Sequence, residues 1–106
     1  MIKIKPQDLT GVALDWAVAK CEGLRFEEWE TWGNYSTDWA QGGPIIEREG
    51  ISVDRIGGAW TADIADSVGG YIEHTEFGPT PLIAAMRCYV ASKLGDEIEI
   101  PKEIAP

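Results

Sequence analysis

The sequence predicts a small α+β domain in which two main helices and a short broken central helix pack on a small antiparallel sheet. Helix-start and helix-end signals enclose apolar residues in one segment near each end of the chain. Between these segments, alternating apolar and polar residues lie on both sides of a glycine pair, which is typical of a hairpin. A chain of 106 residues has room for one modest core. We therefore expect one domain over residues 1–106, with residues 101–106 as a candidate disordered tail.

The first helix is predicted over residues 10–22. Thr10 suits the N-cap position, and Leu9 and Leu14 stand where a hydrophobic staple would close. Gly23 can take the left-handed conformation that ends a helix. Three acidic residues recur at every seventh position, and we expect them to form a narrow solvent-exposed stripe: Asp8, Asp15 and Glu22. Apolar residues fill most other positions and predict a largely buried helix: Val12, Ala13, Trp16, Ala17 and Ala19.

The second helix is predicted over residues 80–95. Thr80 suits the N-cap, Pro81 occupies the first helical position, where its missing N–H costs nothing, and Gly95 suits the end. Large apolar residues follow the helical period: Leu82, Ile83, Met86, Tyr89, Val90 and Leu94. We interpret this face as core rather than as a cofactor site, because few of its positions are polar.

The strands are predicted mainly between these helices. Residues 51–56 and 59–64 alternate in polarity around Gly57-Gly58, which suits a tight hairpin turn. Shorter strands are expected at residues 2–5 and 97–100. Two segments fit no regular period: residues 24–33, interpreted as an irregular edge strand or loop, and residues 65–79, interpreted as a mobile connection.

The central stretch, residues 35–49, predicts the broken helix. A short helical turn would be capped by Ser36 or Thr37, and Asp38 would lie at its positive end. The pair Gly42-Gly43 would break this turn, and Pro44 would open a second one. Three residues of the stretch are expected to face the core: Trp39, Ile45 and Ile46.

The charge of the chain favours some classes of partner over others. There are 18 acidic and 9 basic residues, which gives a formal net charge of −9. Such a surface repels phosphate backbones, so direct nucleic-acid binding is disfavoured. The same field attracts a basic protein surface, although a net negative charge also serves solubility. No apolar run suits a secretory signal or a membrane span, which predicts a cytoplasmic location.

Motifs for catalysis, cofactors and metals are missing from the sequence. The glycine pairs fit neither a phosphate-binding loop nor a dinucleotide fingerprint, so we expect no cofactor. His74 is the only histidine; it could act as a base near neutral pH, but no nucleophile motif accompanies it. Cys21 and Cys88 lack metal-ligand spacing and are expected to pack as small apolar residues. No catalytic, cofactor-binding or metal-ligating residue is assigned.

Aromatic residues cluster before the central stretch. Trp16, Trp39 and Trp60 are interpreted as core residues, because tryptophans bury much apolar area in a small domain. Trp29 and Trp32 have acidic neighbours that suggest partial exposure. Since tryptophan and tyrosine often anchor interfaces, the candidate interaction surface consists of Trp29, Trp32, Tyr35 and Asp38.

Three segments resemble a known family of phage proteins. YSTDWAQGGPIIE at residues 35–47 and GPTPLIAAMR at residues 78–87 closely resemble the NinX family of lambdoid phages. LTGVALDWAVAK at residues 9–20 fits the N-terminal helix of the same family. The chain is also similar to small phage domains described as an α-β-α sandwich. The resemblance implies that fold and a phage or prophage gene product from an accessory region, but it implies no activity and no catalytic residues.

These observations lead to three hypotheses about function. The first is a non-enzymatic phage accessory protein in the host cytoplasm that contacts a basic host or phage protein. The second is a small enzyme or ligand-binding domain with a site near Tyr35, Asp38, Trp39 and His74. The third is an acidic mimic of nucleic acid. The identity of the partner and the oligomeric state stay open.

Overall fold

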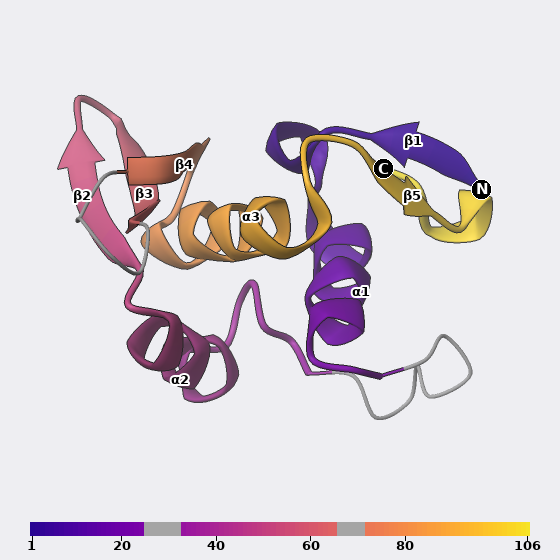
Figure 1. The fold of residues 1–106 in the computed structure, drawn as a ribbon, viewed down its shortest axis with the longest axis horizontal. Coiled ribbons are helices and arrows are strands. Elements are labelled where there is room, and N and C mark those ends of the chain that lie inside the picture. Colours follow the sequence, from indigo (N-terminus) through magenta and orange to yellow (C-terminus); the bar gives the residue numbers. More distant parts are fainter. Residues whose placement is uncertain (25–32, 66–71) are drawn as a thin grey trace.

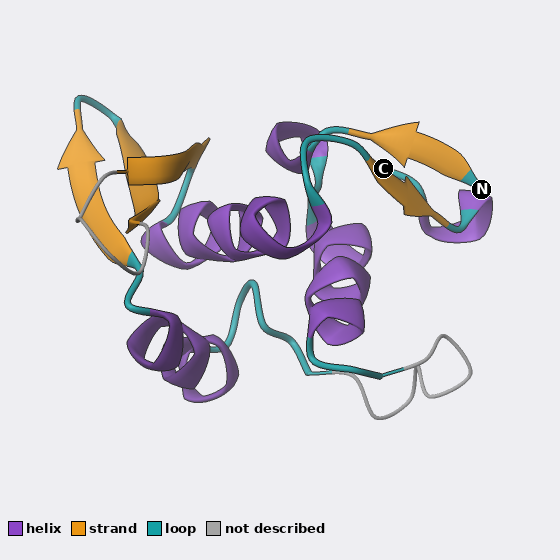
Figure 2. Ribbon diagram, viewed as in Figure 1, coloured by secondary structure: helices purple, strands orange, loops and turns teal. Residues whose placement is uncertain are grey.

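Helix α3, Pro81–Leu94, lies at the centre of the fold (Figure 1). The computed structural model describes residues 1–24, 33–65 and 72–106. Helices and strands are shown by type in Figure 2 and confirm the predicted α+β class. The elements are β1 Ile2–Ile4, η1 Pro6–Asp8, α1 Gly11–Cys21, α2 Trp39–Glu49, β2 Ser52–Ile56, β3 Ala59–Ala65, β4 Ile72–Gly78, α3, β5 Ile98–Ile100 and η3 Lys102–Ile104.

The strands form two antiparallel sheets. One sheet has the order β2-β3-β4, and its first two strands are the predicted hairpin, which turns at Gly57-Gly58. Gly57 has a φ of 60°, a left-handed conformation that favours glycine. The other sheet joins the two predicted terminal strands, with β1 paired to β5, and so brings the N- and C-terminal segments side by side (Figure 1).

The two faces of the three-stranded sheet have different environments. A Cβ atom added at Gly78 would lie only 2.7 Å from the backbone nitrogen of Ala84, so this face of β4 packs closely on α3. Because side chains alternate along a strand, Glu76 points to the same side as Gly78, and Phe77 points to the opposite side. The register places Asp54 on β2 and Thr61 on β3 beside Phe77. We call the side that carries these three residues the outer face.

Helix α3 forms as its sequence predicts and carries most of the core. The Thr80 hydroxyl accepts a hydrogen bond from the Ile83 amide at 3.1 Å, Pro81 stands in the first turn, and Gly95 caps the end. Large residues from three helices and β5 are fully or almost fully buried around it: Leu14, Val18, Ile45, Met86, Tyr89, Val90 and Ile100.

Helix α1 has the predicted position but differs in its surface. Thr10 is the N-cap residue, yet its side chain makes no capping hydrogen bond. Val12 was expected to be buried and is 54% exposed, because it lies on the solvent side of the first turn. The expected exposed stripe is also wrong for Asp15 and Glu22, which are half-buried. Their face of the helix is covered by the chain that leads into α2 and by α2 itself.

Helix α2 is continuous where the sequence predicted a break. It runs through Gly42, Gly43 and Pro44, and its N-cap is Asp38 rather than Ser36 or Thr37. The Asp38 carboxylate accepts hydrogen bonds from the Ala40 amide and the Gln41 side chain, both at 2.9 Å. These bonds satisfy the start of the helix and offset the hydrogen bond that the proline cannot donate.

The side chains of α2 meet the core only in part. Ile45 is buried and Ile46 is half-buried, as predicted. Trp39 was expected in the core and is 54% exposed, because it lines an open cleft beside Thr80 and Leu82 at the start of α3 rather than the core. Its ring lies 3.7 Å from the position of a Cβ atom at Gly43, one turn further along. Trp16 is buried and Trp60 is half-buried.

The segment interpreted as a mobile connection contains strand β4. Residues 72–78 pair with β3 from Ala65↔Ile72 to Trp60↔Gly78, with an irregularity at residues 64 and 65. The glycine pairs and Pro79 obscured a short alternating pattern that becomes regular only beside β3. Residues 25–32 and 66–71 lie outside the described residues. The first range includes Trp29, Trp32 and most of the segment 24–33 that was interpreted as an irregular edge strand or loop.

Candidate functional site

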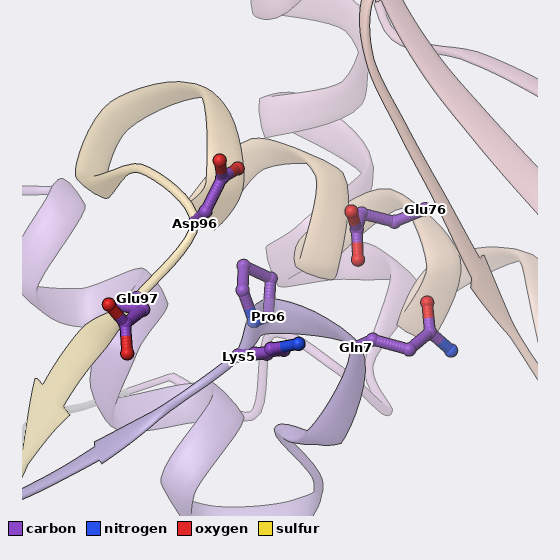
Figure 3. Close-up of a pocket in the computed structure, with 6 residues that line it drawn as sticks. All are labelled: Lys5, Pro6, Gln7, Glu76, Asp96 and Glu97. Carbon is purple, nitrogen blue, oxygen red and sulfur yellow. The ribbon is translucent and has the colours of Figure 1, made fainter.

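A pocket of about 430 Å³ opens between η1, β4 and the connection from α3 to β5 (Figure 3). It is lined by Lys5, Pro6, Gln7, Glu76, Asp96 and Glu97. Three of these side chains carry carboxylates and one carries an ammonium group. The pocket is therefore acidic, and it lies where segments that are far apart in the sequence meet.

Glu76 is the most unusual residue of the pocket. It projects from the α3-facing side of β4, and its Oε1 atom is buried without a hydrogen-bond partner. Burial raises the pKa of its carboxyl group, the positive charge of Arg87 opposes this rise, and the negative charge of Asp96 adds to it. A carboxylate in this position is stabilised by any further positive charge that enters the pocket.

The wall of the pocket is fixed by hydrogen bonds to strand β4. The Gln7 side chain donates to the Phe77 carbonyl at 3.3 Å and accepts from the Phe77 amide at 3.2 Å. Arg87, which is only 6% exposed, donates to the carbonyl oxygens of Leu9 at 3.0 Å and Phe77 at 2.7 Å. These bonds hold η1, α3 and β4 together, so Glu76 projects from a rigid support.

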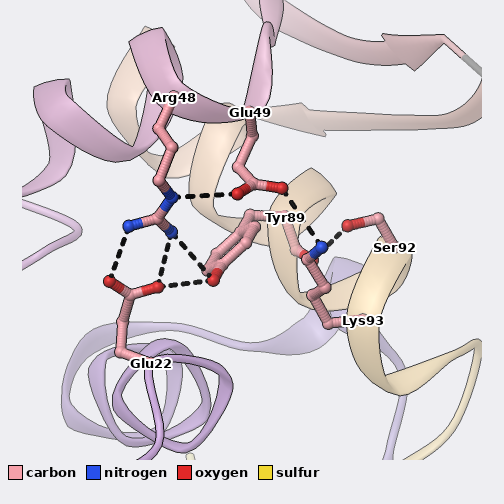
Figure 4. Close-up of polar contacts among 6 residues, drawn as sticks. All are labelled: Glu22, Arg48, Glu49, Tyr89, Ser92 and Lys93. Atoms are coloured by element: carbon pink, nitrogen blue, oxygen red, sulfur yellow. Dashed lines mark hydrogen bonds and ion pairs between the residues drawn. The ribbon is translucent and has the colours of Figure 1, made fainter. Parts of the chain in front are cut away.

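A second polar cluster joins the three helices (Figure 4). Arg48 donates to both carboxylate oxygens of Glu22, at 3.1 and 2.7 Å, and to Glu49 at 2.9 Å. Tyr89 donates to Glu22 at 2.5 Å, and Lys93 lies 3.2 Å from Glu49. We call these five residues the helix-joining cluster. Every charge in it has an opposite partner, so its arrangement indicates a structural role.

The cluster shifts the pKa values of its own acids. Hydrogen bonds from Arg48, which outweigh the effect of burial, lower the pKa of Glu22 below its usual range. The same side chain is the largest cause that lowers the pKa of Glu49. Burial and the hydrogen bond to Glu22 raise the pKa of Tyr89. Both acids are thus held ionised and Tyr89 is held neutral.

The structure places the predicted site residues at different locations. Tyr35 is half-buried before α2, and Asp38 caps that helix. Trp39 contributes to a shallow apolar cleft of about 210 Å³, and Tyr35, Asp38 and His74 are not among the residues that line it. His74 lies on β4, where its carbonyl accepts a bond from the Cys88 thiol at 3.5 Å. The structure therefore does not bring the four residues of the second hypothesis into this cleft.

The acidic pocket could hardly be predicted from the sequence. Its residues come from three segments, and only the tertiary fold brings Lys5, Glu76 and Asp96 together. The one local sign was the pair Asp96-Glu97 directly after the glycine that ends α3.

The described residues offer few groups for other chemistry. Within residues 1–24, 33–65 and 72–106, no three acidic, histidine or cysteine side chains are placed to hold a metal ion. Burial raises the pKa of Cys21 and of Cys88 to about 12, so both free thiols stay protonated at neutral pH. None of the described helices has the length and apolar character needed to cross a bilayer.

Comparison with known proteins agrees with the resemblance seen in the sequence. The family model for NinX of bacteriophage P22 matches residues 5–93. This range includes η1, α1, α2, the three-stranded sheet and nearly all of α3. A search of curated proteins gave no match. Because the model covers most of the chain, this protein belongs to the NinX family of bacteriophage proteins.

Proposed function

We propose that this chain is a non-enzymatic phage accessory protein that acts as one domain in the host cytoplasm by binding a basic protein. The observation that supports the proposal best is the acidic pocket between η1, β4 and the α3–β5 connection. Its lining has three carboxylates, of Glu76, Asp96 and Glu97, against the single ammonium group of Lys5. A lysine or arginine side chain of a partner would neutralise that excess.

The distribution of basic residues also supports binding of a basic partner. Arg48 and Lys93 are paired with Glu22 and Glu49, and Arg87 is buried against backbone carbonyls. The charges of Arg48 and Lys93 are therefore balanced by neighbouring carboxylates, and these three cations offset little of the acidic surface elsewhere on a chain with a total charge of −9. An acidic surface of this kind steers basic partners and accelerates their association.

The approach to α2 is a second region that could contact the same partner. The candidate surface of Trp29, Trp32, Tyr35 and Asp38 stays a proposal. Trp39 adds weight to this region, because its indole is more than half exposed beside Asp38. Exposed tryptophans are frequent anchors of protein interfaces.

The test is affinity capture from a lysate of the host bacterium, at low and at high salt. The pocket variant Glu76→Gln/Asp96→Asn/Glu97→Gln changes the formal charge from −9 to −6. The control Glu47→Gln/Glu99→Gln/Glu103→Gln makes the same change at exposed positions outside the pocket. We expect a basic partner that the wild type and the control retain at low salt and that the pocket variant loses. Failure of the wild type to retain any specific, salt-sensitive partner would refute the proposal.

A further inference from the structure

The outer face of the three-stranded sheet combines exposed apolar side chains with acidic ones. Phe77 on β4 is 47% exposed, and Ile56 on β2 is 59% exposed. Asp54 lies in the same row of the sheet as Phe77, separated from it by Thr61, which is only 4% exposed. Asp63 lies in the next row, beside Thr75. Exposed apolar residues that are rimmed by polar ones are typical of interaction sites.

This face has no helix on it among the described elements. Helix α3 packs on the opposite side, where Gly78 lies against Ala84. Strand alternation places Arg55 on that opposite side too, and its guanidinium lies 5.7 Å from the centre of the Trp60 ring. The outer face of strands β2 to β4, as described, therefore carries aspartates but no lysine or arginine.

The acidic side chains keep their charge available to a partner. The Asp54 carboxylate accepts a hydrogen bond from the Arg55 amide at 2.8 Å, and the Asp63 carboxylate accepts one from the Thr75 hydroxyl at 2.7 Å. Neither bond neutralises the carboxylate. The two charges are fixed in position and stand beside apolar surface.

The outer face also meets the acidic pocket at one edge of the sheet. Glu76 in the pocket and Phe77 on the outer face are consecutive residues of the edge strand β4. Gln7, which lines the pocket, is hydrogen-bonded to the backbone of Phe77. The pocket and the outer face are therefore adjacent at the edge of β4, on opposite sides of the strand.

We propose that the outer face is the docking surface for a segment of a basic protein in which an apolar side chain is flanked by lysine or arginine. The apolar side chain packs on Phe77 and Ile56, and the basic side chains pair with Asp54 and Asp63. This inference rests on the proposed function, because it assigns a surface to the same basic partner. A second copy of this chain is a poor occupant, since face-to-face contact would bring the aspartates of both copies together.

The test uses a display library of random peptides selected on the wild-type protein. Selected peptides should combine lysine or arginine with an aromatic or aliphatic residue. The variant Ile56→Ser/Phe77→Ser should bind a selected synthetic peptide at least about tenfold more weakly, the effect of losing one to two anchoring side chains. Asp54→Asn/Asp63→Asn should bind it more weakly and with less dependence on salt. The control Val12→Ser removes an equally exposed apolar side chain from α1 and should bind like the wild type.

The outcomes separate this inference from the proposed function. Undiminished binding of the peptides to Ile56→Ser/Phe77→Ser would overturn the docking surface, even if the pocket variant still loses its partner from the lysate. If this variant loses peptide binding but no basic partner is found in the lysate, the docking surface is supported and the proposed function is refuted. Circular dichroism verifies that each variant is folded. If Ile56→Ser/Phe77→Ser does not fold, the single variant Ile56→Ser replaces it in the binding measurement.

Discussion

The Arg48 guanidinium on α2 holds the Glu22 carboxylate at the end of α1 through two hydrogen bonds, at 3.1 and 2.7 Å. The two residues are 26 positions apart in the sequence. Helix α2 has only Gly42 and Ile45 fully buried, so apolar packing alone fixes its position weakly. The polar contacts of Arg48 with Glu22 and Tyr89, and of Glu49 with Lys93, therefore contribute much of the attachment of α2 to the other helices.

A double-mutant cycle between Arg48 and Glu22 should show this coupling. We expect Arg48→Ala and Glu22→Ala each to lower the free energy of unfolding, with a coupling energy of about 1 kcal/mol, because bidentate geometry offsets the solvent screening of a half-exposed arginine. Urea denaturation at low salt measures it, and high salt should reduce it. Glu47→Ala on the exposed side of α2 is the control, and a coupling energy near zero would contradict the prediction.

The two glycines of α2 should respond in opposite ways to substitution by alanine. At Gly43 the new Cβ atom would lie 3.7 Å from the Trp39 ring, an ordinary contact, so Gly43→Ala should stabilise the protein by about 0.5–1 kcal/mol through helix propensity. At Gly42 it would collide with the Tyr35 carbonyl oxygen and lie 2.6 Å from Leu82, so Gly42→Ala should destabilise it. Thermal denaturation measures the change in melting temperature of each variant. Equal changes for the two variants would show that the close approach of Gly42 to its neighbours is unimportant.

Removal of the buried guanidinium of Arg87 should be costly. Arg87→Met fills a similar volume but leaves the carbonyl oxygens of Leu9 and Phe77 without these donors. We expect a loss of about 2–4 kcal/mol in the free energy of unfolding, measured in urea. Arg87→Lys should lose less, because one ammonium group can still reach one of the two carbonyls. A loss below that of an exposed control, Lys102→Met, would contradict this role.

The stability of the protein should fall in acid because of the helix-joining cluster. The pKa values of Glu22 and Glu49 are lowered in the fold from an ordinary value of 4.5. Their stabilising contribution is therefore fully present above the unfolded pKa and is lost as pH falls through the folded values. Melting temperatures measured from pH 7 downward should show a smaller acid-dependent decrease for Glu22→Gln/Glu49→Gln than for the wild type.

Glu76→Gln is a useful comparison in the same measurement, because the carboxyl group of Glu76 should change stability with pH in the opposite direction. The pKa of Glu76 is raised by burial, so its contribution is present below the unfolded value and is lost as pH rises through the folded value. Glu76→Gln should therefore be more stable than the wild type at pH 7, and this advantage should shrink in acid. Parallel pH profiles for all three proteins would show that these carboxyl groups do not control the pH dependence.

Elements with local signals could be predicted from the sequence. Helix α3 and the β2–β3 hairpin depend on Thr80, Pro81 and the turn Gly57-Gly58, whose effects act within a few residues. Asp15 and Glu22 are seven positions apart, and this spacing correctly placed them on one face of α1. Spacing alone does not show what covers that face. The contacts with Ser36 and Arg48 that bury them arise only in the tertiary fold.

Other features depended on contacts that the sequence does not reveal. Helix α2 continues through two glycines and a proline because Asp38 caps it and Gly42 packs closely on Leu82. Strand β4 becomes regular through pairing with β3. The acidic pocket combines Lys5, Glu76 and Asp96, whose segments meet only after η1 and the end of α3 have packed against the sheet.

The Gln7 side chain also has a consequence for how this protein behaves at high concentration. A strand at the edge of a sheet presents free backbone groups on which another chain can extend the sheet and start aggregation. At Phe77 the Gln7 carboxamide occupies both of these groups, as a neighbouring strand would. One side chain of the N-terminal segment thus blocks extension of the sheet at this position of β4, and it helps to keep neighbouring molecules apart.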